Sequence, residues 1–209
     1  MLFRNRVDAG HRLAQALEPY KGRRPLILAI PRGAVPMGKA LANDLDGDFD
    51  VVMVRKIGAL HGPEFALGAV DESGWVYRNP WAEGDAGTLA HFENERRAQL
   101  EVLRRRRAMY TPHRASLNPA GRIVIVVDDG LATGATMIAA LHAVRARGPE
   151  RLVCAIPVAS PDAVEKVRAW ADEIVCLTAP DDFQAVGQYY VDFNQVTDEE
   201  VVALLGECK

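Results

Sequence analysis

Cysteine is scarce in this sequence, and long apolar segments are missing. The three cysteines, Cys154, Cys176 and Cys208, form no CxxC pair, so a zinc ribbon or a dithiol redox motif is not expected. An odd number of widely separated cysteines is typical of a reducing compartment. No apolar run approaches the roughly 20 residues of a membrane span, and no apolar segment follows the charged residues 1–6. These absences predict a cytoplasmic protein with no membrane partner.

A strong excess of one charge is also missing. The chain has 25 Lys+Arg against 28 Asp+Glu, a formal net charge of -3. Such a balanced surface gives no electrostatic reason to expect nucleic acid as the main partner. Hydrophobic residues make up 49% of the 209 residues, which is enough to bury a sizeable core without disulfides.

Several common catalytic and nucleotide-binding motifs do not occur. No GxGxxG follows a predicted strand, and the chain contains neither GxSxG nor HExxH. A Walker A loop has four residues between its glycines and then a lysine. Here Gly130 and Gly134 are separated by three residues, and Ala135 follows them.

Short apolar runs alternate with helix-periodic segments along most of the chain. Continuously apolar runs are typical of strands that are covered on both faces of a parallel sheet. We expect strands at 25–30, 50–55, 122–127, 151–156 and 174–178, and helices near 34–45, 135–147 and 161–171. The alternation predicts an α/β fold with a doubly wound, mainly parallel five-stranded sheet of order 2-1-3-4-5.

Other segments are expected to lie outside this core of about 22–178. Residues 66–70 and 75–77 predict an edge hairpin, preceded by a loop at 57–63. A charged helical insertion is expected within about 80–118. The two chain ends, about 1–20 and 180–209, are expected to form a small hood, so that 1–209 is one domain.

The predicted strand order brings two polar segments together. The first and third strands are neighbours at the point where the winding of the sheet reverses, and ligands of open α/β sheets bind at the carboxyl ends of strands there. Pro31-Arg32-Gly33 follows the first strand and Asp128-Asp129 follows the third. We therefore expect both segments to face the same crevice.

The segment from Asp128 to Thr136 carries the strongest chemical signal. Two acids stand at the end of a buried strand, and a turn of small and hydroxyl residues leads into a helix. Backbone N–H groups at a helix N-terminus bind anions. The adjacent carboxylates suit sugar hydroxyls and a hard cation held through its water shell. The alternative is a capped strand-to-helix turn that binds nothing.

This segment resembles the signature of type I phosphoribosyltransferases, which binds 5-phosphoribosyl-1-pyrophosphate (PRPP). In this family an apolar strand precedes two acids and a small-residue loop ending Thr-Gly-x-Thr, as Thr133-Gly134-Ala135-Thr136 does here. The resemblance implies that Asp128 and Asp129 bind the ribose hydroxyls and, through water, Mg²⁺. It also implies that the loop binds the 5′-phosphate, with PRPP contacts from Gly130, Leu131, Ala132, Thr133, Gly134, Ala135 and Thr136.

The resemblance extends to two basic segments. Pro31, Arg32 and Gly33 take the place of the family's pyrophosphate loop, and the less favoured alternative is that Arg32 is a solvated loop residue. Arg55 and Lys56 close the predicted second strand, where family members place a basic residue against the pyrophosphate. Neighbouring side chains of a strand point in opposite directions, and we favour Lys56 for the site. The predicted catalytic residues are Lys56, Arg32 and Asp129.

Residues 57–78 match the family's mobile catalytic loop in position. Such a loop would exclude water from the reacting groups. Within it, His61 and Glu64 are polar candidates, or else solvated loop residues.

The acceptor side is less defined by the sequence. Some purine-salvage members carry an acid where this chain has Ala132, so no general base is assigned. Phe183, Tyr189 and Asp192 in the expected hood could form a base pocket, because aromatic faces with a carboxylate suit a nucleobase. The alternative is that they pack the core of the hood.

The predicted helix around 92–109 is rich in arginine. Its Glu93/Arg97 and Glu101/Arg105 spacings predict i,i+4 pairs on an exposed face. The segment is expected to be a solvated helix face or a contact in a homo-oligomer. A phosphate-bearing partner such as RNA is the less favoured alternative.

The function predicted from the resemblance is transfer of the 5-phosphoribosyl group from PRPP to a nitrogenous base, with Mg²⁺ as cofactor and pyrophosphate as product. A regulator that binds PRPP or a nucleotide without turnover is the alternative. Hydrolysis or phosphorolysis at the same site also stays open, since fold alone does not decide function.

Overall fold

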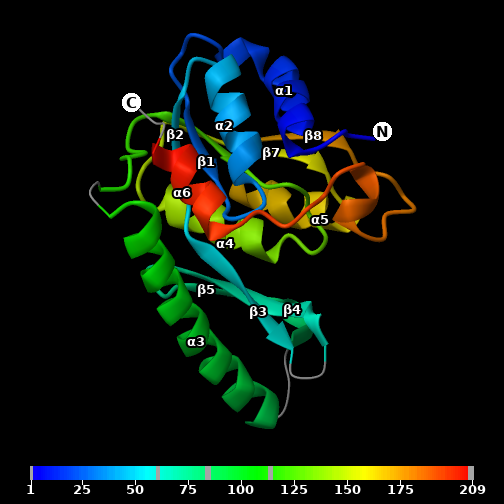
Figure 1. Ribbon diagram of the computed structural model, residues 1–209. Helices are drawn as coiled ribbons and strands as arrows, with labels where there is room; N and C mark the ends of the chain where they lie inside the picture. The colour runs from blue at the N-terminus through cyan, green and yellow to red at the C-terminus, as the bar shows by residue number, and fades with distance from the viewer. Residues whose placement is uncertain (1, 60–61, 83–85, 113–114, 207–209) are drawn as a thin grey trace.

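The computed structural model describes residues 2–59, 62–82, 86–112 and 115–206. Its core is a five-stranded sheet in which every neighbouring pair is parallel (Figure 1). The strands are β1 (Leu26–Ala29), β2 (Asp48–Val51), β6 (Ile123–Val127), β7 (Arg151–Val158) and β8 (Glu173–Thr178). Their order is β2-β1-β6-β7-β8. These are the first to fifth core strands of the sequence prediction, so the predicted order 2-1-3-4-5 is confirmed.

Helices cover both faces of this sheet. Helices α1 (Arg6–Ala16) and α2 (Val35–Asp44) pack on one face, and α4 (Ala135–Arg145) and α5 (Pro161–Val167) pack on the other. All five side chains of β6 are buried, and they alternate between the two apolar clusters. This double cover explains why β6 is apolar throughout, with no polar residue at alternate positions.

A second, antiparallel sheet lies below the core in Figure 1. Its strands are β3 (Val54–Ala59), β4 (Gly62–Asp71) and β5 (Val76–Arg78), in the order β3-β4-β5. The prediction of one strand at 50–55 was therefore wrong, since the chain leaves β2 at Val51 and begins β3 at Val54. The boundary carries no signal in the sequence, because Val51 to Val54 is one continuous apolar and buried run.

The predicted hairpin and loop also need correction. The hairpin is part of this separate sheet and is not an edge of the core sheet. Residues predicted as a loop at 57–63 partly belong to β3 and β4. Gly58 misled the prediction, because it stands at a register irregularity inside the strand pair, where a glycine marks a bulge and not a loop.

The charged segment predicted as an insertion contains one long helix, α3 (Ala86–Tyr110), beside the second sheet. Phe92 and Leu103 on its inner side are buried. The predicted i,i+4 ion pairs are not the ones formed. Arg96 pairs with Glu93 at 2.9 Å and Arg104 pairs with Glu101 at 2.5 Å, both at i,i+3 spacing. None of the described helices is both long and apolar enough to cross a bilayer.

The N-terminal segment pairs with the segment around Tyr190. Phe3 N donates to Tyr189 O at 2.8 Å, and Val191 N donates to Phe3 O at 2.8 Å. The C-terminal helix α6 (Asp198–Gly206) contacts α2 and α3. Short 3-10 helices complete the fold at Glu18–Tyr20, Pro80–Ala82, Arg168–Trp170 and, as η4, Val186–Tyr189.

Candidate functional site

The two polar segments expected at the reversal of the sheet do lie side by side. Ala29 at the end of β1 is in register with Val127 at the end of β6, and Ile30 N donates to Val127 O at 3.0 Å. The loop Pro31-Arg32-Gly33 then passes directly against Asp129. A Cβ atom on Gly33 would overlap the Asp129 carboxylate, so this close approach requires glycine. The peptide bond between Pro31 and Arg32 is cis.

The turn after Asp129 encloses a hollow of about 220 Å³ at the N-terminus of α4. Gly134 caps this helix with φ +79, a left-handed conformation that favours glycine. The hollow is lined by Lys56, Asp128, Gly130, Leu131, Ala132, Thr133, Gly134, Ala135, Thr136, Met137 and Val186. It therefore collects the whole predicted phosphate loop, together with one of the predicted cations.

Some backbone N–H groups of the loop donate no hydrogen bond to a described residue, whereas other backbone groups of the loop are paired. Leu131 N donates to Val158 O at 3.0 Å, and the Ser160 hydroxyl donates to Ala132 O at 2.9 Å, which anchors the turn to the end of β7. Within the described part of the chain, the amides of Ala132, Thr133 and Gly134 donate to no other residue. Successive unpaired amides at a helix N-terminus form an anion site.

The side chains of Arg55 and Lys56 on β3 point in opposite directions, as expected for neighbours on a strand. Lys56 lines the phosphate hollow, whereas the Arg55 side chain lies against α3 and donates to the Gln99 side chain. The side chains of these two residues therefore point to opposite sides of the same strand, and of the two only Lys56 lines the phosphate hollow.

Burial dominates the electrostatics of the two carboxylates. Burial, followed by the charge of Asp129, raises the pKa of Asp128 well above its usual range. Burial also raises the pKa of Asp129, although the Arg6 guanidinium opposes this effect. Asp128 accepts a hydrogen bond from Asp129 N at 2.9 Å. Two partly buried acids side by side are poorly stabilised by the protein alone, which is typical of a site that binds hydroxyls or a cation.

Arg6 was missed by the sequence analysis. Its Nε donates to Asp129 Oδ2 at 2.8 Å, and only 11% of the Arg6 side chain is exposed. The guanidinium also lies 3.9 Å from the centre of the Phe193 ring and donates to Asn194 O at 2.7 Å. The pair joins residues 123 positions apart, so no local pattern could have indicated it.

The predicted base-pocket residues have the following contacts. Phe183 and Tyr189 stack on each other with their ring centres 5.8 Å apart. Asp192 is exposed and accepts hydrogen bonds from the backbone and side-chain nitrogens of Asn194, at 3.2 and 2.7 Å. Val186, from the segment predicted to form the hood, lines the phosphate hollow. Of the two loop candidates, His61 lies outside the described residues, as does the side chain of Glu64.

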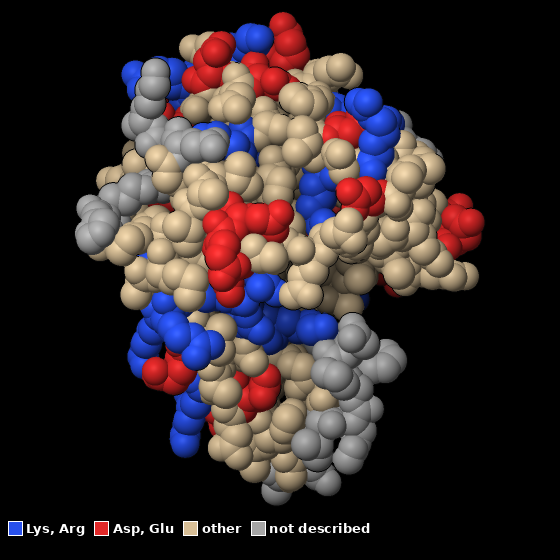
Figure 2. All heavy atoms as spheres, viewed as in Figure 1, with Lys and Arg blue, Asp and Glu red and all other residues tan. Residues whose placement is uncertain are grey.

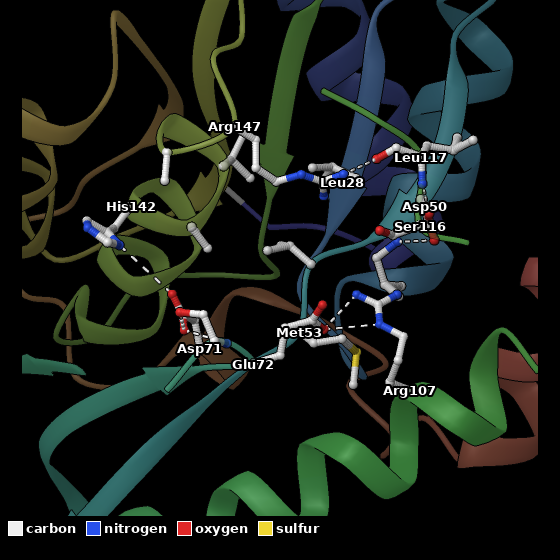
Figure 3. Close-up of a pocket in the computed structure, with 16 residues that line it drawn as sticks. Leu28, Asp50, Met53, Asp71, Glu72, Arg107, Ser116, Leu117, His142 and Arg147 are labelled. Carbon is white, nitrogen blue, oxygen red and sulfur yellow. Dashed lines mark hydrogen bonds and ion pairs between the residues drawn. The ribbon is translucent and has the colours of Figure 1, made fainter. Parts of the chain in front are cut away.

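A second hollow, of about 310 Å³, lies between α4, the β4–β5 turn and α3 (Figure 3). None of the predicted site residues lines it. Its acids have partners, since Arg107 donates to Glu72 at 3.1 and 2.8 Å and Asp50 accepts from Leu117 N at 2.8 Å. His142 faces Asp71 at 3.9 Å. The lining comes from distant segments and includes acids and bases in similar number, so its charge indicates no ligand class.

Comparison with known proteins gives one consistent family. The family model described as "Phosphoribosyl transferase domain" matches residues 4–194. Two Mycobacterium tuberculosis proteins, from strains CDC 1551 / Oshkosh and H37Rv, are each 42% identical over 205 residues and carry the name "Putative phosphoribosyl transferase". The match covers 98% of this chain but 46% of theirs, so the chain spans about half the length of these relatives.

A solved structure agrees over the whole chain. The protein TT1426 from Thermus thermophilus is 48% identical, with a TM-score of 0.82, and the match covers 100% of this chain and 99% of that one. The similarity therefore includes the second sheet and α3 as well as the core.

Proposed function

Because this chain belongs to the phosphoribosyl transferase domain family, we propose that it transfers the 5-phosphoribosyl group of PRPP to a nitrogenous base. The observation that carries the proposal is the juxtaposition of two carboxylates whose pKa burial raises, Asp128 and Asp129, with a turn in which three successive amides, Ala132 to Gly134, donate to no described residue. One half of this arrangement suits a sugar diol, and the other suits the phosphate on the same sugar.

Each part of the site has a role in this proposal. The amides of Ala132, Thr133 and Gly134 bind the 5′-phosphate and fix the sugar. Asp128 and Asp129 accept hydrogen bonds from the ribose hydroxyls. Lys56 neutralises charge on the 5′-phosphate, and Arg32 neutralises charge on the leaving diphosphate.

The donor set also fits Mg²⁺ as the proposed cofactor. Among the described residues, no three His, Cys, Asp or Glu side chains gather as a complete metal site. Mg²⁺ commonly uses one or two carboxylates, water and substrate phosphates, which matches Asp128 and Asp129 beside a phosphate loop. When bound, the ion would neutralise developing charge on the diphosphate.

In the proposed reaction, the bond from the ribose C1 to the diphosphate oxygen breaks while a bond from C1 to a base nitrogen forms. Pyrophosphate leaves with the electron pair of the broken bond, and the base loses one proton. Arg32 offsets the charge that appears on pyrophosphate, and Lys56 offsets the charge of the 5′-phosphate in the hollow that it lines. We assign no residue to proton removal, since Ala132 takes the place of the acid that some family members have.

The test is release of pyrophosphate from PRPP and Mg²⁺ by the full chain, against adenine, guanine, hypoxanthine, uracil and orotate. Turnover with any base supports the transferase. Tight PRPP binding without turnover would instead support the regulator that binds PRPP.

The site assignment is tested with Asp129→Asn, for which the exposed Asp181→Asn is the matched control. Charge-assisted hydrogen bonds contribute about 1.5–3 kcal/mol, so PRPP affinity should fall about tenfold to a hundredfold in Asp129→Asn alone. Equal PRPP affinity in both variants would remove the basis of the proposal.

A further inference from the structure

The carboxylate of Asp198, at the start of α6, lies between two arginines that are far apart in the sequence. Arg32 Nη1 is 3.6 Å from Asp198 Oδ2, and Arg106 Nε is 3.4 Å from Asp198 Oδ1. The hydroxyl of Tyr110 also donates to Asp198 Oδ1. One acid of the C-terminal helix is therefore held by the loop after β1 and by the arginine-rich helix α3.

A third arginine belongs to the same cluster. Arg55 is held from β3 against α3 by its bond to Gln99. Gln99 stands seven residues, about two helical turns, before Arg106, so Arg55 lies along the same face of α3 as Arg106. Burial and the charges of Arg106 and Arg32 lower the pKa of Arg55, and the Glu95 carboxylate opposes this effect. Figure 2 shows Lys and Arg side chains gathered at the junction between the core and α3, with acidic side chains directly above them where Figure 1 places α6.

The charges of this cluster do not balance. Two guanidinium groups, those of Arg32 and Arg106, face the single carboxylate of Asp198, so this carboxylate offsets only one of the two positive charges. Arginines that repel one another are stabilised by an anion with several acceptor oxygens, because guanidinium groups bind such oxygens in pairs. A diphosphate has more charge and more oxygens than the carboxylate that now lies there.

The cluster also adjoins the proposed sugar site. Arg32 precedes Gly33, which touches the Asp129 carboxylate. A ribose held by Asp128 and Asp129 would therefore carry its C1 substituent beside the loop that bears Arg32. The opposite end of the sugar would face the phosphate hollow around Thr133.

We propose that Arg106 of α3 binds the diphosphate of PRPP together with Arg32 and Arg55, and that Asp198 competes with the diphosphate for this site. The inference rests on the proposed function and adds to it a binding residue from the insertion and a competing acid from α6. The diphosphate can replace the Asp198 carboxylate if this side chain rotates towards solvent, since 27% of the side chain is already exposed.

The first test measures the affinity of the full chain for inorganic pyrophosphate and for PRPP by calorimetry at fixed ionic strength. Asp198→Asn removes the competing charge and should tighten both ligands about fivefold to thirtyfold, the range that corresponds to about 1–2 kcal/mol. The control is Glu199→Gln, which neutralises an exposed acid in the same helical turn and should change neither affinity. Misfolding cannot imitate a gain in affinity.

The second test removes the positive charge of Arg106. Arg106→Gln should weaken pyrophosphate binding at least tenfold, whereas Arg104→Gln, an exposed arginine paired with Glu101, should leave it unchanged. Arg106→Lys keeps the charge and should recover part of the affinity, which separates charge from folding. Unchanged affinity in Asp198→Asn, or pyrophosphate binding by Arg106→Gln equal to that of wild type, would overturn the inference.

These outcomes stay distinct from those of the proposed function. If wild type binds pyrophosphate through Arg106 but does not bind PRPP, the anion cluster stands and the proposed transfer fails. If wild type binds PRPP in a manner that depends on Asp128 but not on Arg106, the proposed site stands and this inference fails.

Discussion

Replacing Asp128 by asparagine should stabilise the protein at neutral pH while it removes PRPP binding. Asp128 is partly buried beside a second acid, and it accepts one hydrogen bond from Asp129 N. Asparagine has nearly the same shape, and its side-chain oxygen can keep that bond. What is lost is a negative charge that burial and the neighbouring Asp129 both disfavour.

The sign of the pH dependence follows from the direction of the pKa shift. The pKa of Asp128 in the folded state lies above the ordinary value of 3.8. Below that value the group is protonated in both states and does not affect stability. As pH rises from 3.8 through the folded-state pKa, the unfolded chain loses its proton first and wild-type stability falls. Asp128→Asn avoids this loss. The difference in free energy of unfolding between the variant and wild type should therefore grow as pH rises and then level off above the folded-state pKa.

The free energy of unfolding of Asp128→Asn should exceed that of wild type by about 0.5–2 kcal/mol at pH 7, the range typical of a single stabilising substitution. For a protein of this size, each kcal/mol corresponds to about 2–4 °C in Tm. The assay is urea unfolding from pH 4 to pH 8, with Asp181→Asn as the control for loss of an exposed charge. A variant that is no more stable than wild type at pH 7, or whose gain does not depend on pH, would refute the reasoning.

Three further predictions concern the glycines of the site and the thiol behind it. Gly33→Ala should displace the Asp129 carboxylate and weaken PRPP binding at least tenfold by calorimetry, while Gly206→Ala, whose new methyl meets nothing within 4 Å, should bind normally. Gly134→Ala should lower the free energy of unfolding by about 1–2 kcal/mol in urea, because φ is +79 there and a left-handed conformation disfavours a side chain. Cys154 should resist alkylation in the native state and react only in denaturant, as peptide mass mapping would show, since it is fully buried and burial raises the pKa of its thiol. Labelling of native Cys154 at the rate of the denatured chain would contradict that burial.

The core sheet was predictable because its signals are local. Each strand is a short apolar run, and each connecting helix has its own period, so element types and order followed from neighbouring residues. The failure at Val51 to Val54 has the opposite cause. Nothing in that run indicates where one sheet ends and the next begins, because both sheets bury the same kinds of side chain.

The proposed phosphate loop was also predictable as a segment, because Asp128 to Thr136 is contiguous and its turn needs only a strand before it and a helix after it. Its assignment as a PRPP site stays a prediction. The role of α3 was not predictable in the same way. Its arginines were expected to face solvent or another copy of the chain, whereas the structure directs Arg106 towards Asp198 and Arg107 towards Glu72.

The sequence by itself determined the alternation of strands and helices, the strand order and the segment that bears the paired acids. Only the tertiary structure decided which charges meet. Arg6 reaches Asp129 across 123 positions, and Arg32, Arg106 and Asp198 come together from three separate parts of the chain. The physical reason is one of range: hydrophobic periodicity acts between near neighbours in sequence, whereas an ion pair depends on distances in space that exist only once the sheet has assembled.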